Sequence, residues 1–219
     1  MKPLGWIGSA KHDLLEFPDN VVRDIGHALY VAQIGGKHPS AKPLQGFGGA
    51  GVLEIVEDYA GDAYRAVYTV RFAEVIYVLH VFQKKSRRGI ATPRREIERV
   101  RTRLRRAGGG ISEVAKREAV IYSTDSAFHA LDLPDADDLV LRAELMRKIG
   151  EIVAARGLTQ SQAGALLRMD QPRVSALVKG KIAKFSTDRL LQALSDLGQD
   201  VELRITPARA GKGRLRVAA

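Results

Sequence analysis

The sequence contains two groups of residues whose types and spacing could do chemistry. The first group is cationic and lies between residues 65 and 88. Such a group suits contact with a polyanion. Lysine and arginine supply positive charge, and histidine can move a proton near neutral pH. The residues of this group are Arg65, Arg71, His80, Lys84, Lys85, Arg87 and Arg88.

Each of these residues also has a plainer interpretation. His80 lies in the hydrophobic run VIYVLHVF, so it could equally be a hydrogen-bonded core residue. The run Lys84–Arg88 could serve only to bind ribosomal RNA or a protein partner, and the arginines of residues 94–106 could form a solvated helix face. The sequence has no cysteine and no cluster of Asp, Glu and His that suggests a metal site, so we expect neither a metal nor a cofactor.

The second group lies in the segment QPRVSALVKGK, residues 171–181. Pro172 fits the first turn of a helix, where its missing N–H would have no intrahelical partner. Val174, Leu177 and Val178 are spaced three and four apart and are expected to face a core. Polar side chains then face outward, where an amide can pair with a base edge and an arginine with guanine or phosphate. The candidate DNA-binding residues are Gln171, Arg173, Ser175, Lys179 and Lys181.

Helices and one strand are expected to position this second group. The periodicity predicts helices over residues 135–157 and 186–198, and Thr159 with Gln162 forms a capping box at the start of another helix. Residues 200–206 alternate apolar and polar side chains, which predicts a terminal strand with the apolar positions Val201, Leu203 and Ile205. A small helical bundle with no role in DNA binding is the alternative interpretation.

Strands are expected to position the first group. Three runs rich in Val, Ile and Tyr are separated by short turns, which is typical of hairpins; they span residues 52–58, 63–72 and 74–83. Helices are predicted before and after these runs, over residues 11–17, 19–35 and 92–108, and the last of them has the apolar stripe Ile97, Val100 and Leu104.

The three glycines Gly108–Gly110 mark the clearest break in the chain, because consecutive glycines are costly inside a helix or strand and suit a linker. The 219 residues carry a net charge of +10, and residues 1–110 hold 18 Lys and Arg against 11 Asp and Glu. A balance this basic favours contact with a polyanion such as DNA or RNA. The sequence therefore predicts an α+β protein with a mixed helix-and-sheet first half and a helical second half.

The N-terminus has no long apolar core, and no apolar run is long enough to span a bilayer. The absence of cysteine also suits a reducing compartment. We expect a cytoplasmic protein without membrane contact.

The second half resembles the XRE/Cro-type repressors, and in particular the HigA-type antitoxins. The resemblance rests on Asp170–Gly180, with the pattern DQPxVSxLxxG, and on Phe185–Glu202, with the pattern FSxxRLxxxLxxLGxDVE. It implies a lambda-repressor-like, all-helical helix-turn-helix domain with a terminal strand. One departure is Arg168, which stands where the family usually has glycine. A left-handed backbone there would cost about 1 kcal/mol for a residue other than glycine, so the turn could be remodelled.

The first half resembles the RelE/HigB-type toxins, especially the phage Gp49-like branch. The resemblance implies a small antiparallel sheet flanked by helices, and active members of that family cut mRNA on the ribosome. RNA cleavage by attack of the 2′-hydroxyl group requires a proton acceptor, stabilisation of the charged phosphate and a proton for the leaving oxygen. The resemblance therefore implies candidate catalytic residues, Arg65, His80, Lys84 and Lys85, and candidate RNA-binding residues, Arg71, Arg87 and Arg88. The matching residues are Arg65, Ala66, Tyr68, Tyr77, Leu79, His80, Phe82, Lys84, Lys85, Thr92, Pro93, Glu96 and Ile97.

The two resemblances together imply a fused toxin–antitoxin pair. We expect a toxin domain over residues 1–107, a linker and neutralising arm over 108–135, a helix-turn-helix domain over 136–206 and a basic tail over 207–219. The expected partners are operator DNA, bound as a homodimer, together with mRNA and the ribosome. The toxin and antitoxin parts are also expected to contact each other within the chain.

Two alternatives remain open. In one, the chain is a DNA-binding regulator whose toxin-like domain is inactive and serves structure or dimerisation. A weaker one is a free RNA-binding protein.

Overall fold

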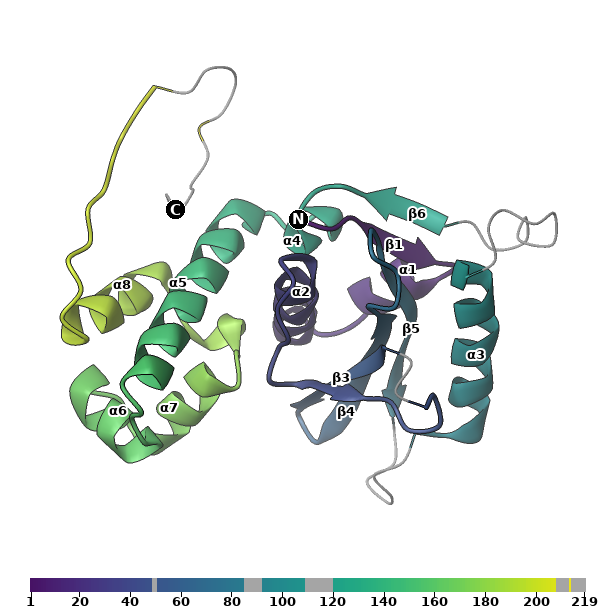
Figure 1. Cartoon of the computed structure of the whole chain (residues 1–219), viewed down its shortest axis with the longest axis horizontal. Coiled ribbons are helices and arrows are strands. Elements are labelled where there is room, and N and C mark those ends of the chain that lie inside the picture. Colours follow the sequence, from purple (N-terminus) through teal and green to yellow (C-terminus); the bar gives the residue numbers. More distant parts are fainter. Residues whose placement is uncertain (49–50, 85–91, 109–119, 208–212, 214–219) are drawn as a thin grey trace. The chain divides into compact units, whose positions relative to one another are not determined.

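The computed structural model describes residues 1–48, 51–84, 92–108, 120–207 and 213. The chain divides into two compact units, Met1–Leu131 and Asp132–Ala219, which are drawn in Figure 1. The division falls inside the segment 108–135 that the sequence assigns to a linker and arm. Residues 120–131 of that segment belong to the first unit. Most of the expected basic tail lies outside the described residues.

A six-stranded sheet forms the centre of the first unit. Its strand order is β2-β3-β4-β5-β1-β6, with β1 and β5 parallel and every other neighbouring pair antiparallel. The strands are β1 (Leu4–Ile7), β2 (Ala41–Pro43), β3 (Val52–Tyr59), β4 (Asp62–Thr69), β5 (Ile76–Lys84) and β6 (Val120–Ser123). The three predicted strands correspond to β3, β4 and β5. The strands β1, β2 and β6 were not predicted, because segments of three or four residues are specified by their partners rather than by a local pattern.

Helices α2 and α3 cover opposite faces of this sheet (Figure 1). The helices of the unit are α1 (Ala10–Leu15), α2 (Asp19–Gln33), α3 (Arg94–Gly108) and the short α4 (Ala127–Ala130). Val100 of α3 is fully buried, and Ile97 and Leu104 pack against the same core, which confirms the predicted apolar stripe. The sheet contributes Ile7, Val67 and Leu79 to this core.

An aromatic ring of the neighbouring strand β5 packs tightly against the backbone of β1. A Cβ atom at Gly5 would lie 2.6 Å from the ring of Tyr77, so only glycine fits without displacing that ring. The hydroxyls of Tyr77 on β5 and Tyr122 on β6 lie 3.3 Å apart. Burial and this hydrogen bond raise the pKa of Tyr77 to about 12. The tyrosine pair therefore links β6 to the rest of the sheet across β1.

Residues 120–131, hereafter the docked segment, complete the first unit. Its strand β6 pairs antiparallel with β1 and forms the edge of the sheet. The side-chain amide of Gln33, at the end of α2, donates to the carbonyls of Lys2 at 2.9 Å and Asp125 at 3.0 Å. The amide oxygen of Gln33 accepts from the backbone N–H of Ala127 at 2.6 Å. One buried side chain thus joins the segment before β1, helix α2 and the docked segment.

Apolar packing also holds the docked segment. Phe128 is fully buried and Leu131 is buried, and both lie beside Gly26 of α2. A Cβ atom at Gly26 would approach the ring of Phe128 to 3.3 Å, so glycine lets α4 lie close to α2. The ring of Tyr30 lies 5.7 Å from that of Phe128, centre to centre. Burying a phenylalanine contributes about 1.5–3 kcal/mol relative to leaving it in water.

The second unit consists of helices in its described part. They are α5 (Ala136–Ala155), α6 (Gln160–Leu167), α7 (Gln171–Val178), a short 3₁₀ helix η2 (Ile182–Lys184) and α8 (Thr187–Asp196). Its core includes the buried side chains Leu139, Ile149, Leu167, Val174, Ile182 and Leu190. Asp138 of α5 forms an ion pair with Arg142 and accepts a hydrogen bond from the hydroxyl of Thr187, which ties α5 to α8.

The predicted terminal strand over residues 200–206 is wrong for this structure. Residues 201–207 belong to no helix or strand, and the exposed fractions of Leu203 and Ile205 are 79% and 95%. The described part of the second unit holds no other strand for this segment to pair with. Without a neighbouring strand, the backbone N–H and C=O groups of this segment cannot form the hydrogen bonds that stabilise an extended conformation.

Across the described ranges, no helix is both long and apolar enough to cross a membrane. The same residues contain no group of three or more His, Asp and Glu that could hold a metal ion.

Candidate nucleic-acid interfaces

Helices α6 and α7 form a helix-turn-helix with capped N-termini. The hydroxyl of Thr159 accepts from the N–H of Gln162 at 3.2 Å, and the Gln162 side chain accepts from the N–H of Thr159 at 2.9 Å. This is the predicted capping box. A carboxylate oxygen of Asp170 accepts from the N–H of Arg173 at 2.9 Å, and Pro172 lies in the first turn as predicted. The start of α7 is therefore fixed by its own sequence.

The turn between the two helices contains a residue in the left-handed conformation, and that residue is not glycine. Arg168 has φ 49° and ψ 45°, so the conformation expected for the usual glycine is retained. The carbonyl of the preceding Leu167 accepts a hydrogen bond from Arg189 of α8, which holds the turn from outside. Gly164 lets α6 approach α7, because a Cβ atom there would lie 3.0 Å from the carbonyl oxygen of Met169. The turn is not remodelled, and its strain falls on Arg168.

The polar candidates on α7 differ in accessibility. Gln171, Arg173 and Lys179 are exposed, whereas Ser175 and Lys181 are half-buried. Val174 is fully buried and Leu177 is buried, as predicted for the core face. The prediction that Val178 also faces the core is wrong, since its exposed fraction is 45%. Val178 is the last residue of α7, and the chain turns at Gly180 to bring Ile182 into the core.

The strand register places three of the cationic candidates of the first unit on one face of the sheet. Arg65 on β4 is opposite Phe82 on β5, and Val67 is opposite His80. By alternation, His80 and Lys84 share the face to which Arg65 belongs. This face lies under the first turns of α3, because Arg65 contacts Thr92 and His80 contacts Glu96.

Arg65 is buried, with an exposed fraction of 5%. Its guanidinium forms an ion pair with Glu54 on β3 at 2.6 Å and donates to the hydroxyl of Thr92 at 2.8 Å. The Thr92 hydroxyl also lies 3.3 Å from the Glu54 carboxylate. Arg65 therefore connects the sheet to the segment that leads into α3.

His80 is also buried and is bonded at both ring nitrogens. Arg103 of α3 can only donate, so Nδ1 of His80 accepts its hydrogen bond at 3.2 Å. Nε2 of His80 then carries the proton and donates to the carboxylate of Glu96 at 2.6 Å. Burial lowers the pKa of His80; the hydrogen bond to Glu96 opposes this effect, and the charge of Arg103 adds to it. The neutral imidazole thus bridges β5 and two turns of α3.

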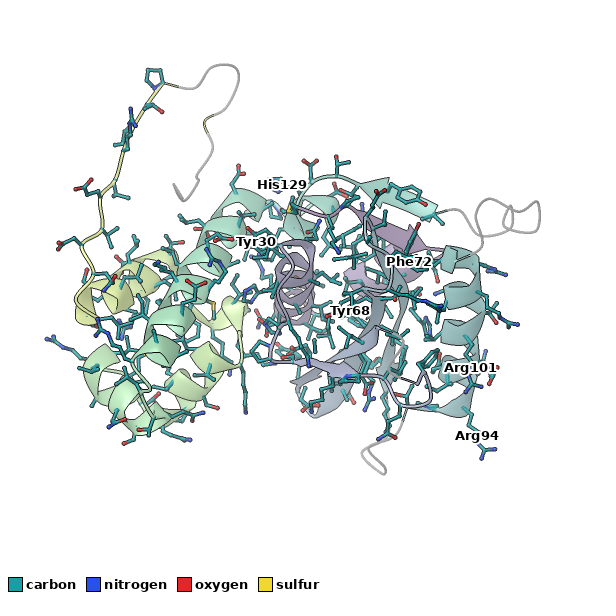
Figure 2. The ribbon with its side chains drawn as sticks, viewed as in Figure 1. Tyr30, Tyr68, Phe72, Arg94, Arg101 and His129 are labelled. Atoms are coloured by element: carbon teal, nitrogen blue, oxygen red, sulfur yellow. The ribbon has the colours of Figure 1, made fainter. Side chains whose placement is uncertain are left out.

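The remaining candidates of the first unit differ in their exposure and in whether the structure describes them. Lys84 is half-buried at the end of β5. Arg71 is exposed and lies two residues beyond the end of β4, so it does not belong to the strand face of Arg65. Lys85, Arg87 and Arg88 lie outside the described residues. Figure 2 shows Arg94 and Arg101 on α3, where Arg101 lies over the ring of Phe47.

Sequence reasoning missed four partners in this network: Glu54, Thr92 as a hydroxyl donor, Glu96 as a carboxylate partner, and Arg103. Thr92 and Glu96 are among the residues that match the toxin family, but that match does not indicate their partners. Helix periodicity gives a local signal for one residue, Arg103. It falls three residues after Val100 and next to Leu104, which places it on the apolar stripe of α3 rather than on the solvated face. Its exposed fraction is 4%. Glu54 could not have been assigned, because its contact depends on the register of β3 against β4.

The comparisons with known proteins also divide the chain into two parts, but the second part begins earlier in the sequence, inside the docked segment. Residues 12–105 match the family model described as phage derived protein Gp49-like, and residues 127–206 match a helix-turn-helix domain model. The chain therefore carries an N-terminal Gp49-like domain of the RelE/HigB toxin type and a C-terminal XRE-like helix-turn-helix domain.

A solved structure named "Putative XRE Family Transcriptional Regulator" is 35% identical in sequence to the matched part. The match covers 39% of this chain and 99% of that one, with a TM-score of 0.36. No curated protein matches the chain.

Proposed function

We propose that the chain is a toxin–antitoxin fusion protein whose helix-turn-helix domain binds operator DNA and represses transcription of its own gene. The observation that carries this proposal is the start of α7, where Gln171 and Arg173 are exposed on a capped helix. Exposed amide and guanidinium groups at the start of such a helix suit base edges in the major groove. The half-buried Ser175 and Lys181 and the exposed Lys179 lie close by in sequence and suit phosphate contacts.

The DNA-binding form is a homodimer in this proposal. Val201, Leu203 and Ile205 alternate with polar residues and are exposed in the single chain. Pairing of this segment with its copy from a second chain would satisfy its backbone groups and cover its apolar side chains. Helix-turn-helix dimers read half-sites about 34 Å apart, so the operator should be palindromic.

Gel-shift titration of the full chain against the DNA upstream of its own gene tests the operator proposal. We expect a shift on that DNA at protein concentrations where random DNA of the same length is unshifted. Equal shifts on both DNAs, or none even at low salt, would rule out sequence-specific binding. Replacing Leu203 by Asp should leave the monomer folded but prevent dimerisation and weaken operator binding.

Neutralisation of the toxin domain within the chain is the second part of the proposal. The support is the docked segment, which adds a strand to the sheet edge at β1 and buries Phe128 against α2. A tethered segment acts at an effective concentration on the order of mM, so it can stay bound even when its intrinsic affinity is modest.

The toxin domain itself is proposed to be a metal-independent endoribonuclease that acts on mRNA at the ribosome. Lys84 is the described candidate that remains partly accessible on the face shared with Arg65 and His80. Lys85, Arg87 and Arg88 follow it directly in the sequence and would add positive charge. Primer-extension mapping of mRNA breaks after induction of the toxin domain, with Lys84→Ala alongside, tests this step.

A specific observation favours the second candidate function, a regulator with an inactive toxin-like domain. Arg65 and His80 are both buried, and their polar atoms bond Glu54, Thr92, Glu96 and Arg103. A proton-transfer group must reach the proton that it moves. If a folded toxin domain neither cleaves RNA nor slows growth, this second function is the correct one.

A further inference from the structure

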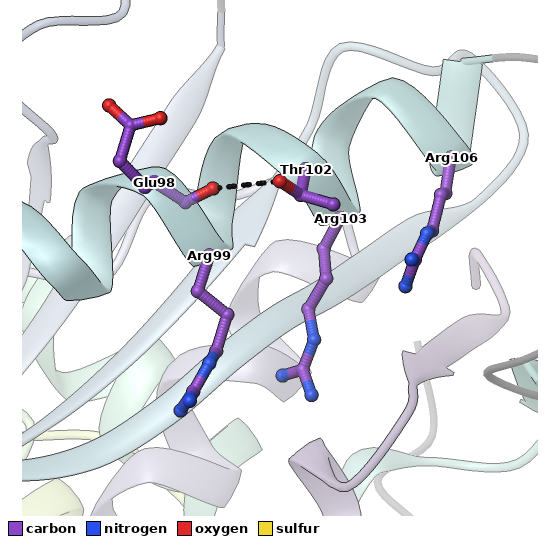
Figure 3. Close-up of a pocket in the computed structure, with 5 residues that line it drawn as sticks. All are labelled: Glu98, Arg99, Thr102, Arg103 and Arg106. Carbon is purple, nitrogen blue, oxygen red and sulfur yellow. Dashed lines mark hydrogen bonds between the residues drawn. The ribbon is translucent and has the colours of Figure 1, made fainter.

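Three arginines of α3 lie on the same side of the helix and line a pocket. Arg99, Arg103 and Arg106 are spaced four and three residues apart, which brings their side chains into one row. Figure 3 shows all three extending from the same side of the helix. The pocket has a volume of about 240 Å³, and Glu98 and Thr102 complete its lining.

The middle arginine of this row is held in a fixed position. Arg103 donates to the carbonyl of Leu79 at 3.0 Å and to Nδ1 of His80 at 3.2 Å, both on β5. It also donates to the hydroxyl of Ser9 at 3.2 Å. Its exposed fraction is only 4% and both of its Nη atoms already have partners, so Arg103 adds positive charge to the pocket rather than a fork of donors for a ligand.

The lining is strongly cationic. Glu98 is the one acidic residue that lines the pocket, and its carboxylate accepts from Nη1 of Arg101, outside the pocket, at 2.8 Å. In Figure 3 this carboxylate points away from the three guanidinium groups. The hydroxyl of Thr102 donates to the carbonyl of Glu98 at 3.0 Å. Outside the lining, the carboxylate of Glu96 lies 3.7 Å from the guanidinium of Arg99. A ligand would therefore meet three guanidinium groups with one carboxylate beside Arg99.

A phosphate group fits this arrangement better than other anions. Arginine presents a planar fork of N–H donors that matches phosphate oxygens two at a time. The pocket is smaller than the roughly 300–1,000 Å³ that drug-sized ligands fill, so it suits one group of a longer molecule rather than a whole cofactor.

We propose that the α3 pocket, lined by Arg99, Arg103 and Arg106, binds a backbone phosphate of single-stranded RNA. The proposal rests on the proposed RNA-directed function of the Gp49-like domain, and it assigns to α3 a phosphate contact beside His80, to which Arg103 is hydrogen-bonded. RNA is favoured over DNA because the pocket belongs to the first unit, whereas the helix-turn-helix lies in the second.

The test compares two charge-matched double variants of the full chain. Arg99→Gln with Arg106→Gln removes two pocket cations, while Arg95→Gln with Arg105→Gln removes two exposed cations from the same helix. Fluorescence anisotropy measures binding of a short RNA without operator sequence between about 50 and 200 mM salt. The pocket variant should bind roughly tenfold more weakly, and its log–log salt slope should fall by about 0.7 for each phosphate that the protein no longer neutralises.

Equal weakening by both double variants overturns the proposal, because net charge alone would then explain it. Absence of RNA binding by the wild-type chain at the lowest salt also overturns it. Titration with inorganic phosphate separates the two sources of the ligand: if free phosphate binds as tightly as RNA does, the site is one for free phosphate. Both variants must unfold at the temperature of the wild-type chain for the comparison to count.

Failure of the nuclease proposal is distinguishable, because binding is measured without cleavage. Loss of RNA binding in the pocket variant, with no cleavage by any form of the chain, supports the pocket and refutes the nuclease. If the pocket variant still cleaves RNA and binds it with unchanged affinity, the result supports the nuclease and refutes the pocket.

Discussion

Arg173 and Lys179 lie at opposite ends of α7 and are expected to contribute differently to DNA binding. Arg173 is in the first turn, where it can reach a base edge, so Arg173→Ala should cost about 1–3 kcal/mol on the operator and relax specificity. Lys179→Ala should weaken operator and random DNA alike and lower the salt slope by about 1. Competition gel shifts with single-base operator variants measure both effects. If the two variants lose the same affinity on every DNA, Arg173 makes no base contact.

The left-handed residue in the helix-turn-helix predicts a gain in stability. Arg168→Gly removes a conformation that costs an L-residue about 1–2 kcal/mol, offset by the greater freedom of glycine in the unfolded chain. We expect a free energy of unfolding higher by about 0.5–1 kcal/mol in urea titrations.

Gly157 provides the matched control for this prediction. It has φ 60° at the end of α5, and a Cβ atom there would meet no other atom within 4 Å, so Gly157→Ala tests backbone strain alone. It should lower stability by about 1 kcal/mol. If neither Gly157→Ala nor Arg168→Gly changes the free energy of unfolding, the left-handed conformation costs nothing at these positions.

The buried imidazole of His80 predicts a dependence of stability on pH. Its pKa in the folded chain is lowered by burial, while in the unfolded chain it lies near 6.5. Between these two values the unfolded chain binds more protons, so the contribution of His80 to stability is complete above pH 6.5 and is lost as the pH falls toward the lowered pKa.

His80→Gln removes this titration while leaving an amide that can still donate to Glu96. Urea unfolding at several pH values between about 5 and 8 should show a steeper loss of stability toward acid for the wild-type chain than for the variant. Parallel curves would mean that His80 does not titrate differently in the folded and unfolded chains.

At the scale of elements, α4 should contribute much of the stability of the first unit. Phe128 is fully buried against α2, so Phe128→Ala should lower the free energy of unfolding by about 3–5 kcal/mol. Ile121 on β6 belongs to the same docked segment but is 51% exposed, and Ile121→Ala should cost well under half as much. Hydrogen exchange of the Ala127 amide, which donates to Gln33, reports whether α4 has detached. Similar small losses in both variants would mean that α4 is not a fixed part of the unit.

At the scale of the whole molecule, the end point of a truncated chain should decide whether it is toxic. Residues 1–107 lack β6 and α4, whereas residues 1–131 form the whole first unit. If the docked segment neutralises the toxin domain, inducing residues 1–107 should arrest growth and translation, while residues 1–131 and the full chain should be harmless. Lys84→Ala, Arg65→Ala and His80→Ala in residues 1–107 should relieve the arrest.

The other outcomes of this experiment are equally informative. If residues 1–131 also arrest growth, the second unit is the part of the chain that neutralises the toxin domain. If residues 1–107 fold but do not slow growth, the result favours a regulator with an inactive toxin-like domain. Circular dichroism and solubility of residues 1–107 must be measured first, since the truncation uncovers the β1 edge and the α2 surface that Phe128 otherwise covers.

Local sequence patterns determined most of the elements and both kinds of domain. The capping residues Thr159 and Asp170, Pro172 and the stripe around Val100 act within one or two helical turns, so their effect could be predicted without knowing the fold. The outward placement of Gln171 and Arg173 follows from the same periodicity.

Only the tertiary structure decided which polar groups meet. His80, Arg103 and Glu96 come together because β5 packs under α3, and Arg65 meets Glu54 because of the β3–β4 register. The same holds for the short strand β6, whose place at the edge of the sheet depends on its pairing with β1. Contacts between residues far apart in sequence depend on the packing of whole elements, and no local pattern encodes that packing.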